Sequence, residues 1–198
     1  MKAAHRPARY DEILDVPETK VAEIIDGEIV ISPRPASPQA LAKTVLGAEL
    51  GDAFVRPPGH SRGPGGWWLL HELELHFGDD VLVPDNLGWR RERLPTLPDV
   101  PAMTLAPDWV CEVLSPITAR IDRARKMRIY AREGVPWLWL VDPLLQTIEV
   151  YALRDGEWVV KAVHAGSAPV RVEPFDAIEL EVARWWIDTA SRGSSLPS

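Results

Sequence analysis

Two acids that close short apolar runs carry the clearest chemical signal in this sequence. Asp85 comes just after the apolar run 81–83, and Glu112 follows the run 109–111. A carboxylate at the end of a buried strand is costly to desolvate unless a positive charge pairs with it. Hard cations such as Mg²⁺ and Mn²⁺ take oxygen ligands, so Asp85 and Glu112 on adjacent strand ends would suit a site for one of these ions.

Such a metal site would serve phosphodiester hydrolysis. A bound hard cation lowers the pKa of an attacking water and neutralises the charge that develops on the phosphate. A simpler interpretation stays open, in which Asp85 and Glu112 lie at exposed strand ends, where they act as caps or pair with arginine side chains.

A third group of polar residues follows Glu112 on an expected helix. Asp122, Lys126 and Tyr130 are spaced four residues apart, which places them in one column on a helix surface. Lys126 could orient the attacking water or stabilise the charged transition state. The alternative is a surface Asp–Lys pair, which contributes only about a few tenths of a kcal/mol.

Glu23 and Glu28 flank the Asp26–Gly27 dipeptide near the N-terminus. One of these two acids could complete the acidic cluster around Asp85. Both could equally be solvated positions of a hairpin.

The elements that would position these residues alternate between strands and helices. The Asp26–Gly27 dipeptide between two β-favouring runs predicts a hairpin. The sequence further predicts a short helix over 10–14, a helix over 39–54, a long hairpin from 67–77 and 81–85, a loop over 86–107, a strand over 108–114, a helix over 118–133, strands over 137–141, 147–151 and 158–163, and a last strand and helix within 178–187. This order indicates a mixed α/β or α+β fold with a central sheet, as one domain over 10–190 with flexible tails at 1–9 and 191–198.

The composition narrows the function classes. The 198 residues carry a formal net charge of −7, which argues against a general polyanion binder but not against local contact with DNA. The N-terminus has no apolar segment typical of a signal peptide, and no apolar run is long enough to span a bilayer. A cytoplasmic protein without a membrane partner is therefore expected.

A series of short motifs runs through nearly the whole chain, from about residue 10 to about residue 181. They are EIIDGE at 23–28, SP at 32–33, VPD at 83–85, PDWVCEVLSP at 107–116, the column Asp122, Lys126 and Tyr130, and WLVDP at 139–143. In this order and spacing they resemble the Uma-type restriction endonucleases, a bacterial family with the PD-(D/E)XK nuclease-like fold.

The resemblance implies a restriction-endonuclease-like core, a mixed sheet flanked by helices with the active site at one sheet edge. It implies that Asp85 and Glu112 bind the metal ion. The lysine of the general PD-(D/E)XK motif would stand two positions after Glu112, where this chain has Leu114. The family pattern places a lysine on the following helix instead, which matches Lys126. At the start of the helix after Ser-Pro, where the family often has a histidine, this chain has residues 38–39, Pro-Gln.

These observations predict a Mg²⁺- or Mn²⁺-dependent endonuclease acting on DNA, with Asp85, Glu112 and Lys126 as catalytic residues. Glu23 or Glu28, together with Asp122 and Tyr130, would be auxiliary. A second hypothesis is a catalytically inactive module of the same fold that binds nucleic acid or a protein partner. A third is a scaffold that forms a homodimer through tryptophans such as Trp67.

Overall fold

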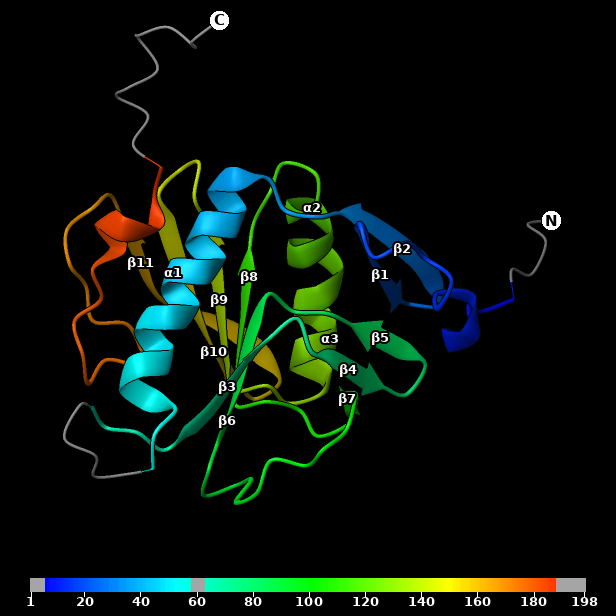
Figure 1. Ribbon diagram of the computed structural model, residues 1–198, viewed down its shortest axis with the longest axis horizontal. Coiled ribbons are helices and arrows are strands. Elements are labelled where there is room, and N and C mark those ends of the chain that lie inside the picture. The colour runs from blue at the N-terminus through cyan, green and yellow to red at the C-terminus, as the bar shows by residue number, and fades with distance from the viewer. Residues whose placement is uncertain (1–5, 58–62, 188–198) are drawn as a thin grey trace, which may run out of the picture.

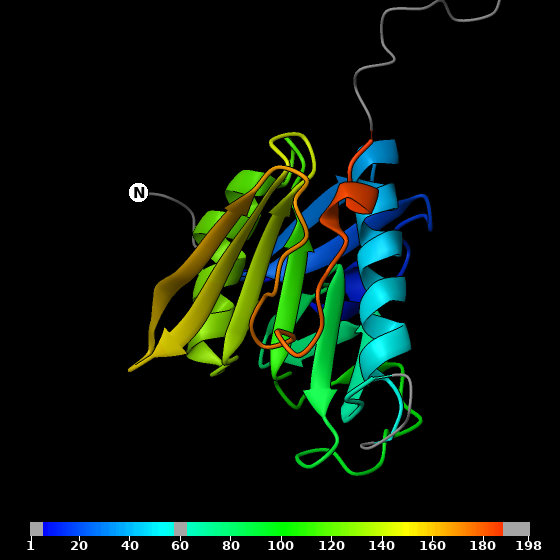
Figure 2. The ribbon, with the colours of Figure 1, turned by 90° about the vertical axis from the view of Figure 1, so that its left-hand side faces the viewer.

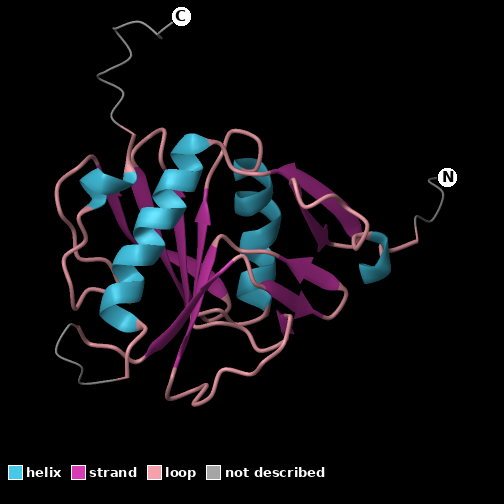
Figure 3. Cartoon of the chain, in the orientation of Figure 1, coloured by secondary structure: helices cyan, strands magenta, loops and turns pink. Residues whose placement is uncertain are grey.

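The computed structural model describes residues 6–57 and 63–187. Two mixed β-sheets and a small number of helices make up this part of the chain (Figures 1 and 3), which confirms the predicted mixed α+β class. The expected C-terminal tail 191–198 and residues 1–5 of the expected N-terminal tail lie outside the described residues. Within the described ranges, no helix has both the length and the apolar character needed to cross a bilayer.

The larger sheet has six strands in the order β11-β10-β9-β8-β6-β3. The strands are β3 (Trp67–His71), β6 (Asn86–Arg90), β8 (Trp109–Val113), β9 (Trp137–Asp142), β10 (Thr147–Arg154) and β11 (Glu157–Ala165). β8 and β9 run parallel and the other neighbours are antiparallel. Helix α1 (Ser37–Phe54) covers one face of this sheet, and a second helix covers the other (Figure 2).

The alternation of side chains along β8 decides which helix each residue meets. Cys111, with its neighbours two positions away on either side, packs in the apolar cluster that includes Leu46 and Leu50 of α1. Val110 and Leu114 belong to the cluster on the opposite face, with Ile129 of the second helix. Glu112 has the same parity as Val110, so its side chain points toward the second helix.

The second helix is the one predicted over 118–133. It comprises α2 (Ala119–Ile121), a π-helical turn η2 (Asp122–Lys126) and α3 (Met127–Arg132), and it ends just before Gly134, whose φ of 76° is typical of a helix C-terminus. The π turn was not predicted. Such wide turns occur frequently at functional sites, and this one contains the buried residues Asp122 and Lys126.

The smaller sheet has five strands in the order β2-β1-β5-β4-β7. They are β1 (Lys20–Ile25), β2 (Glu28–Pro33), β4 (Glu74–Phe77), β5 (Asp80–Leu82) and β7 (Ala102–Met103). β1 and β2 form the hairpin predicted at Asp26–Gly27, which is therefore confirmed. Arg125 and Arg128 of the second helix form ion pairs with Asp26, so the hairpin is held against that helix.

The predicted long hairpin is divided between the two sheets. β4 pairs with β5 in the smaller sheet, while β3 pairs with β6 in the larger one. Between the two pairs lie Glu72, whose φ is 48°, and Asp85, which directly precedes β6. This left-handed backbone at a non-glycine residue turns the chain from one sheet to the other. The division places Asp85 where the two sheets meet.

The prediction of a loop over 86–107 was wrong at its start and near its end, where residues 102–103 form β7. Residues 86–90 form β6, a buried strand between β3 and β8. The run Asp-Asn-Leu-Gly at 85–88 is typical of a turn, but Gly88 is a point of close packing, since a Cβ there would meet the side chain of Leu69 and the backbone of Trp68. The glycine fits the tight sheet and does not mark a loop.

Three smaller expectations also changed. The predicted helix over 10–14 is a short 3-10 turn, η1 (Tyr10–Glu12), and the predicted last strand and helix reduce to a single bridge at Leu180 followed by η3 (Val182–Trp185). Trp67 is only 3% exposed and packs against Phe175 with ring centroids 4.8 Å apart, so it cannot contribute to a dimer surface.

Candidate active site

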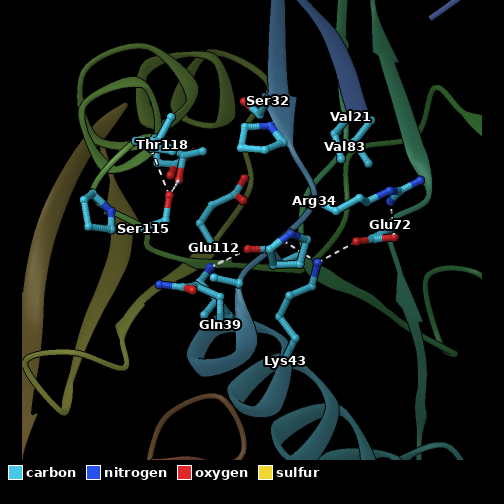
Figure 4. Close-up of a pocket in the computed structure, with 18 of the residues that line it drawn as sticks. Val21, Ser32, Arg34, Gln39, Lys43, Glu72, Val83, Glu112, Ser115 and Thr118 are labelled. Carbon is cyan, nitrogen blue, oxygen red and sulfur yellow. Dashed lines mark hydrogen bonds and ion pairs between the residues drawn. The ribbon is translucent and has the colours of Figure 1, made fainter. Parts of the chain in front are cut away.

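A cavity of about 450 Å³ opens where β1, α1, the end of β8 and the second helix meet (Figure 4). Eight charged side chains line it: the carboxylates Glu23, Glu72, Asp85, Glu112 and Asp122, and the cationic groups Arg34, Lys43 and Lys126. The five carboxylates exceed the three cations by two charges. With every group ionised, the cavity therefore carries a local excess of negative charge that equals the charge of one divalent cation.

Asp85 is anchored to the end of β8. Its Oδ2 accepts a hydrogen bond from the backbone N–H of Val113 at 2.6 Å, and its Oδ1 lies 2.8 Å from Nζ of Lys43 on α1. Because Val113 directly follows Glu112, this backbone bond fixes Asp85 beside the second predicted acid. The two acids line the same cavity.

Glu112 is buried and held by the second helix. Nζ of Lys126 lies 2.8 Å from its Oε1, and the hydroxyl of Tyr130 donates a hydrogen bond to the same oxygen at 2.5 Å. Lys126 is 2% exposed and Tyr130 is completely buried. The predicted column on the helix thus packs directly against Glu112 and is not a surface pair.

Two further acids surround the same lysine. Oε1 of Glu23 on β1 lies 2.9 Å from Nζ of Lys126 and also accepts a hydrogen bond from the backbone N–H of Val83 at 2.8 Å. Oδ1 of Asp122 lies farther away, at 3.8 Å. Lys126 is therefore enclosed by three carboxylates from three different elements.

The electrostatics reflect this crowding of buried acids. Burial raises the pKa of Glu112 to about 8, with Lys126 opposing the shift and the neighbouring acids, Asp122 first, adding to it. Burial likewise raises the pKa of Asp122 to about 6. Burial alone would lower the pKa of Lys126, but Glu112 and Glu23 raise it well above its usual value. Lys126 therefore stays charged while the acids favour a proton or another cation.

Glu28 does not join this group. Its side chain is 66% exposed and forms an ion pair at 2.9 Å with Arg125 of the second helix. Of the two acids that flank the Asp26–Gly27 turn, the structure brings only Glu23 into the cavity.

The sequence analysis missed three charged cavity residues, Arg34, Lys43 and Glu72. Nζ of Lys43 lies 2.6 Å from Oε1 of Glu72, which also pairs with Arg34 at 3.0 Å. Lysine is scarce here, with five in the whole chain, and that scarcity was the only available signal for Lys43. Nothing in the sequence around Glu72 distinguished it from other strand acids.

Gln39 occupies the cavity wall near the start of α1, in the region where the resemblance leads one to expect a histidine. Its side chain is 4% exposed and its Nε2 donates a long hydrogen bond of 3.4 Å to the carbonyl of Leu114. Its Oε1 is buried without a hydrogen-bond partner within the described part of the chain. A buried acceptor without a partner at a cavity wall fits a site that takes a further polar ligand.

Leu114, at the usual position of the motif lysine, lies on the same face of the strand as Glu112. It is 2% exposed and packs in the apolar cluster with Ile129 and Tyr130. A lysine there would point at the second helix. In this chain the second helix supplies the positive charge, because Lys126 extends from that helix to Glu112.

The side chains of the cavity supply only some of the ligands that a hard cation needs. Within residues 6–57 and 63–187, no three His, Cys, Asp or Glu side chains are grouped closely enough to hold a metal ion. Mg²⁺, however, keeps several waters and is often held by one or two carboxylates plus substrate oxygens. Asp85 and Glu112, with the local negative excess around them, meet that requirement.

The architecture and this acidic site together define a nuclease-like protein. The family described as "Uma2: Putative restriction endonuclease" matches residues 7–183, and the chain belongs to this family. A solved structure described as a putative nuclease belonging to DUF820 from Anabaena variabilis is similar to it, with a TM-score of 0.70 and 27% sequence identity. The match covers 91% of this chain and 98% of that one. A search of curated proteins found no match.

The family and the solved structure support a nuclease function for this chain. They also confirm the resemblance inferred from the ordered motifs. The individual roles of Asp85, Glu112 and Lys126 remain predictions.

Proposed function

We propose that the protein is an endonuclease that hydrolyses DNA phosphodiester bonds with the help of Mg²⁺ or Mn²⁺. The observation that carries this proposal is the formal excess of two negative charges in a cavity that Asp85 and Glu112 both line. Charge of this kind inside a protein is costly unless a cation balances it. Membership in a nuclease family agrees with that chemistry.

Asp85 and Glu112 would hold the cation. Once bound, a divalent ion supplies a water of lowered pKa and neutralises charge on the phosphate. Tyr130 and Lys126 both contact Oε1 of Glu112, so the carboxylate is held in one orientation. Val113 does the same for Asp85 through its backbone N–H.

Glu23 and Asp122 have an auxiliary role in this proposal. Both lie next to Lys126 and keep it protonated, since their negative charges raise the pKa of its ammonium group. A protonated Lys126 in turn keeps Glu112 in place. Glu28 has no role, because it lies outside the cavity.

A catalytically inactive module of the same fold is the second candidate. Two observations favour it: Oδ1 of Asp85 already pairs with Lys43, and the described residues contain no group of three closely spaced metal-binding side chains. Such a module would bind DNA or a protein partner without cutting.

A plasmid-nicking assay separates the two candidates. We expect the purified protein to convert supercoiled plasmid to open-circular or linear DNA with Mg²⁺ or Mn²⁺ and not with EDTA. Asp85→Asn and Glu112→Gln should abolish cleavage. Asp155→Asn is a matched control, since Asp155 lies in the exposed β10–β11 turn with a φ of 52°, a conformation that asparagine tolerates. Intact plasmid with folded wild-type protein in both metals would exclude the enzyme and leave the binding module.

A further inference from the structure

The two cavity lysines have different surroundings. Lys126 has a side chain that is 3% exposed, and its Nζ lies between Glu23 and Glu112 at 2.9 and 2.8 Å. Its ammonium group is enclosed by protein carboxylates. It is placed to orient those carboxylates and not to meet a substrate.

Lys43 lies on the open side of the same cavity. Its side chain is 12% exposed and extends from α1 toward Glu72 (Figure 4). It also borders a neighbouring hollow of about 450 Å³ whose wall includes Thr44, Gly47 and His71. Lys43 therefore borders two hollows and its side chain is 12% exposed, whereas Lys126 lines the first cavity with a side chain that is only 3% exposed.

Lys43 pairs with Oδ1 of Asp85, the oxygen that a metal ion would need as its ligand. Oδ2 of Asp85 is bound to the backbone N–H of Val113, which leaves Oδ1 as the oxygen directed toward a ligand. Nζ of Lys43 lies 2.8 Å from this Oδ1. Two positive charges cannot share one carboxylate oxygen without strong repulsion, so a divalent ion on Asp85 must displace Lys43.

Glu72 keeps the displaced lysine close to the site. It pairs with Lys43 at 2.6 Å and is itself fixed by Arg34 at 3.0 Å. Its backbone has a φ of 48°, a conformation that is unfavourable for a glutamate and is found at functional sites. Lys43 can thus leave Asp85 while it remains bound to Glu72 at the mouth of the cavity.

We infer that Lys43 is the lysine that contacts the substrate phosphate, and that Lys126 is a positioning residue for Glu112 and Glu23. Lys43 neutralises Asp85 in the metal-free protein, gives way to the cation, and then donates a hydrogen bond to a non-bridging phosphoryl oxygen. The inference rests on the proposed function, because it takes a divalent cation and a phosphodiester as the ligands of the cavity.

Mn²⁺ titration by calorimetry tests the displacement without any cleavage. Lys43→Met removes the competing charge, so we expect it to bind Mn²⁺ about tenfold more tightly than the wild type. Lys126→Met releases Glu112, so it should bind Mn²⁺ at least about tenfold more weakly. Lys161→Met on β11 is the matched control and should bind as the wild type does. Lys43→Gln, which can still donate a hydrogen bond to Glu72, replaces Lys43→Met if that variant does not fold.

A single-turnover cleavage assay provides the second readout. With Mn²⁺ at saturation, Lys43→Met should cut DNA at least about a hundredfold more slowly although it binds the metal more tightly. Unchanged or weaker Mn²⁺ binding by both Lys43 variants would overturn the inference alone. Absence of Mn²⁺ binding in the wild type would overturn the proposed function, and the inference with it.

Discussion

Nζ of Lys126 lies 2.8 Å from Oε1 of Glu112, with both side chains almost fully buried. This pair joins the second helix to β8 at the point where the cavity begins. Both residues belong to patterns that the sequence already indicates. Glu112 follows a short apolar run, and Lys126 belongs to the column of polar residues on the second helix. The pair is therefore both a structural contact and part of the candidate active site.

The first prediction concerns the stability of this pair. Lys126→Met leaves three acids without their common cation, and breaking a buried ion pair in this way should cost about 3–5 kcal/mol in the free energy of unfolding. Urea denaturation at pH 7 without metal measures it. The double variant Glu112→Gln, Lys126→Met should lose less than the sum of the single variants, since both act on one contact. Simple additivity would contradict a direct interaction.

The second prediction concerns Tyr130. Tyr130→Phe removes the hydroxyl that donates to Glu112 and should cost about 1–3 kcal/mol, because it leaves a buried acceptor without its donor. Tyr151→Phe is a matched control, because Tyr151 donates to Glu149 in a half-exposed position. We expect a smaller loss for the control in the same urea experiment. Equal losses would show that burial of the Tyr130 contact adds nothing.

The site residues that lie on regular helices and strands could be predicted from the sequence. Glu112 lies near the end of a buried strand. Asp122, Lys126 and Tyr130 remain on one side of the second helix in spite of the π turn, so the predicted column is kept. A strand and a helix each have a fixed period, so the sequence alone indicates which side chains share a face.

The other half of the cavity could not be predicted. Lys43 and Glu72 meet Asp85 only because the chain turns from one sheet to the other at Glu72, a residue type that normally avoids positive φ. Local propensity favours an unbroken hairpin there. The sheet-to-sheet turn is decided by tertiary packing, which overrides local preference.

The third prediction uses two glycines of α1. A Cβ at Gly47 would overlap the ring of His71 and come within 3.1 Å of Oδ1 of Asn86, whereas nothing lies within 4 Å of a Cβ at Gly51. Gly51→Ala should stabilise the protein by about 0.5–1 kcal/mol through helix propensity. Gly47→Ala should lose that gain and destabilise the protein instead, because His71 must leave Asn86. Thermal melts of the two variants measure the difference, and equal stabilisation would show that His71 moves without cost.

The fourth prediction separates the two hairpin acids by their effect on cleavage. Glu23→Gln should slow cleavage about tenfold or more, since Glu23 lies 2.9 Å from Lys126 and helps to hold it. Glu28→Gln should leave the rate unchanged, because its side chain is 66% exposed and pairs with Arg125 away from the cavity. Both rates come from the same plasmid assay. A large effect of the Glu28 variant would argue that DNA contacts the hairpin near Glu28.

The last prediction concerns pH and follows from the raised pKa of Glu112. This pKa is about 8 in the folded protein against 4.5 for an ordinary glutamate, so between these values the folded state binds more protons than the unfolded state. Stability therefore falls as pH rises through this window, by about a few kcal/mol in total. Asp122 adds to the same trend up to its pKa of about 6. Lys126 does not oppose it, since its pKa is raised above the window and its charge stays constant.

Thermal melts between pH 6 and 9 in EDTA should therefore show a falling melting temperature. Glu112→Gln should flatten this dependence, because a neutral amide takes the place of the acid that titrates. Mg²⁺ should raise the melting temperature most at the alkaline end, where the ion no longer competes with a proton on Glu112. A metal effect that is equal at pH 6 and pH 9 would mean that the ion binds away from Glu112, and Asp85 would then have to hold it without that partner.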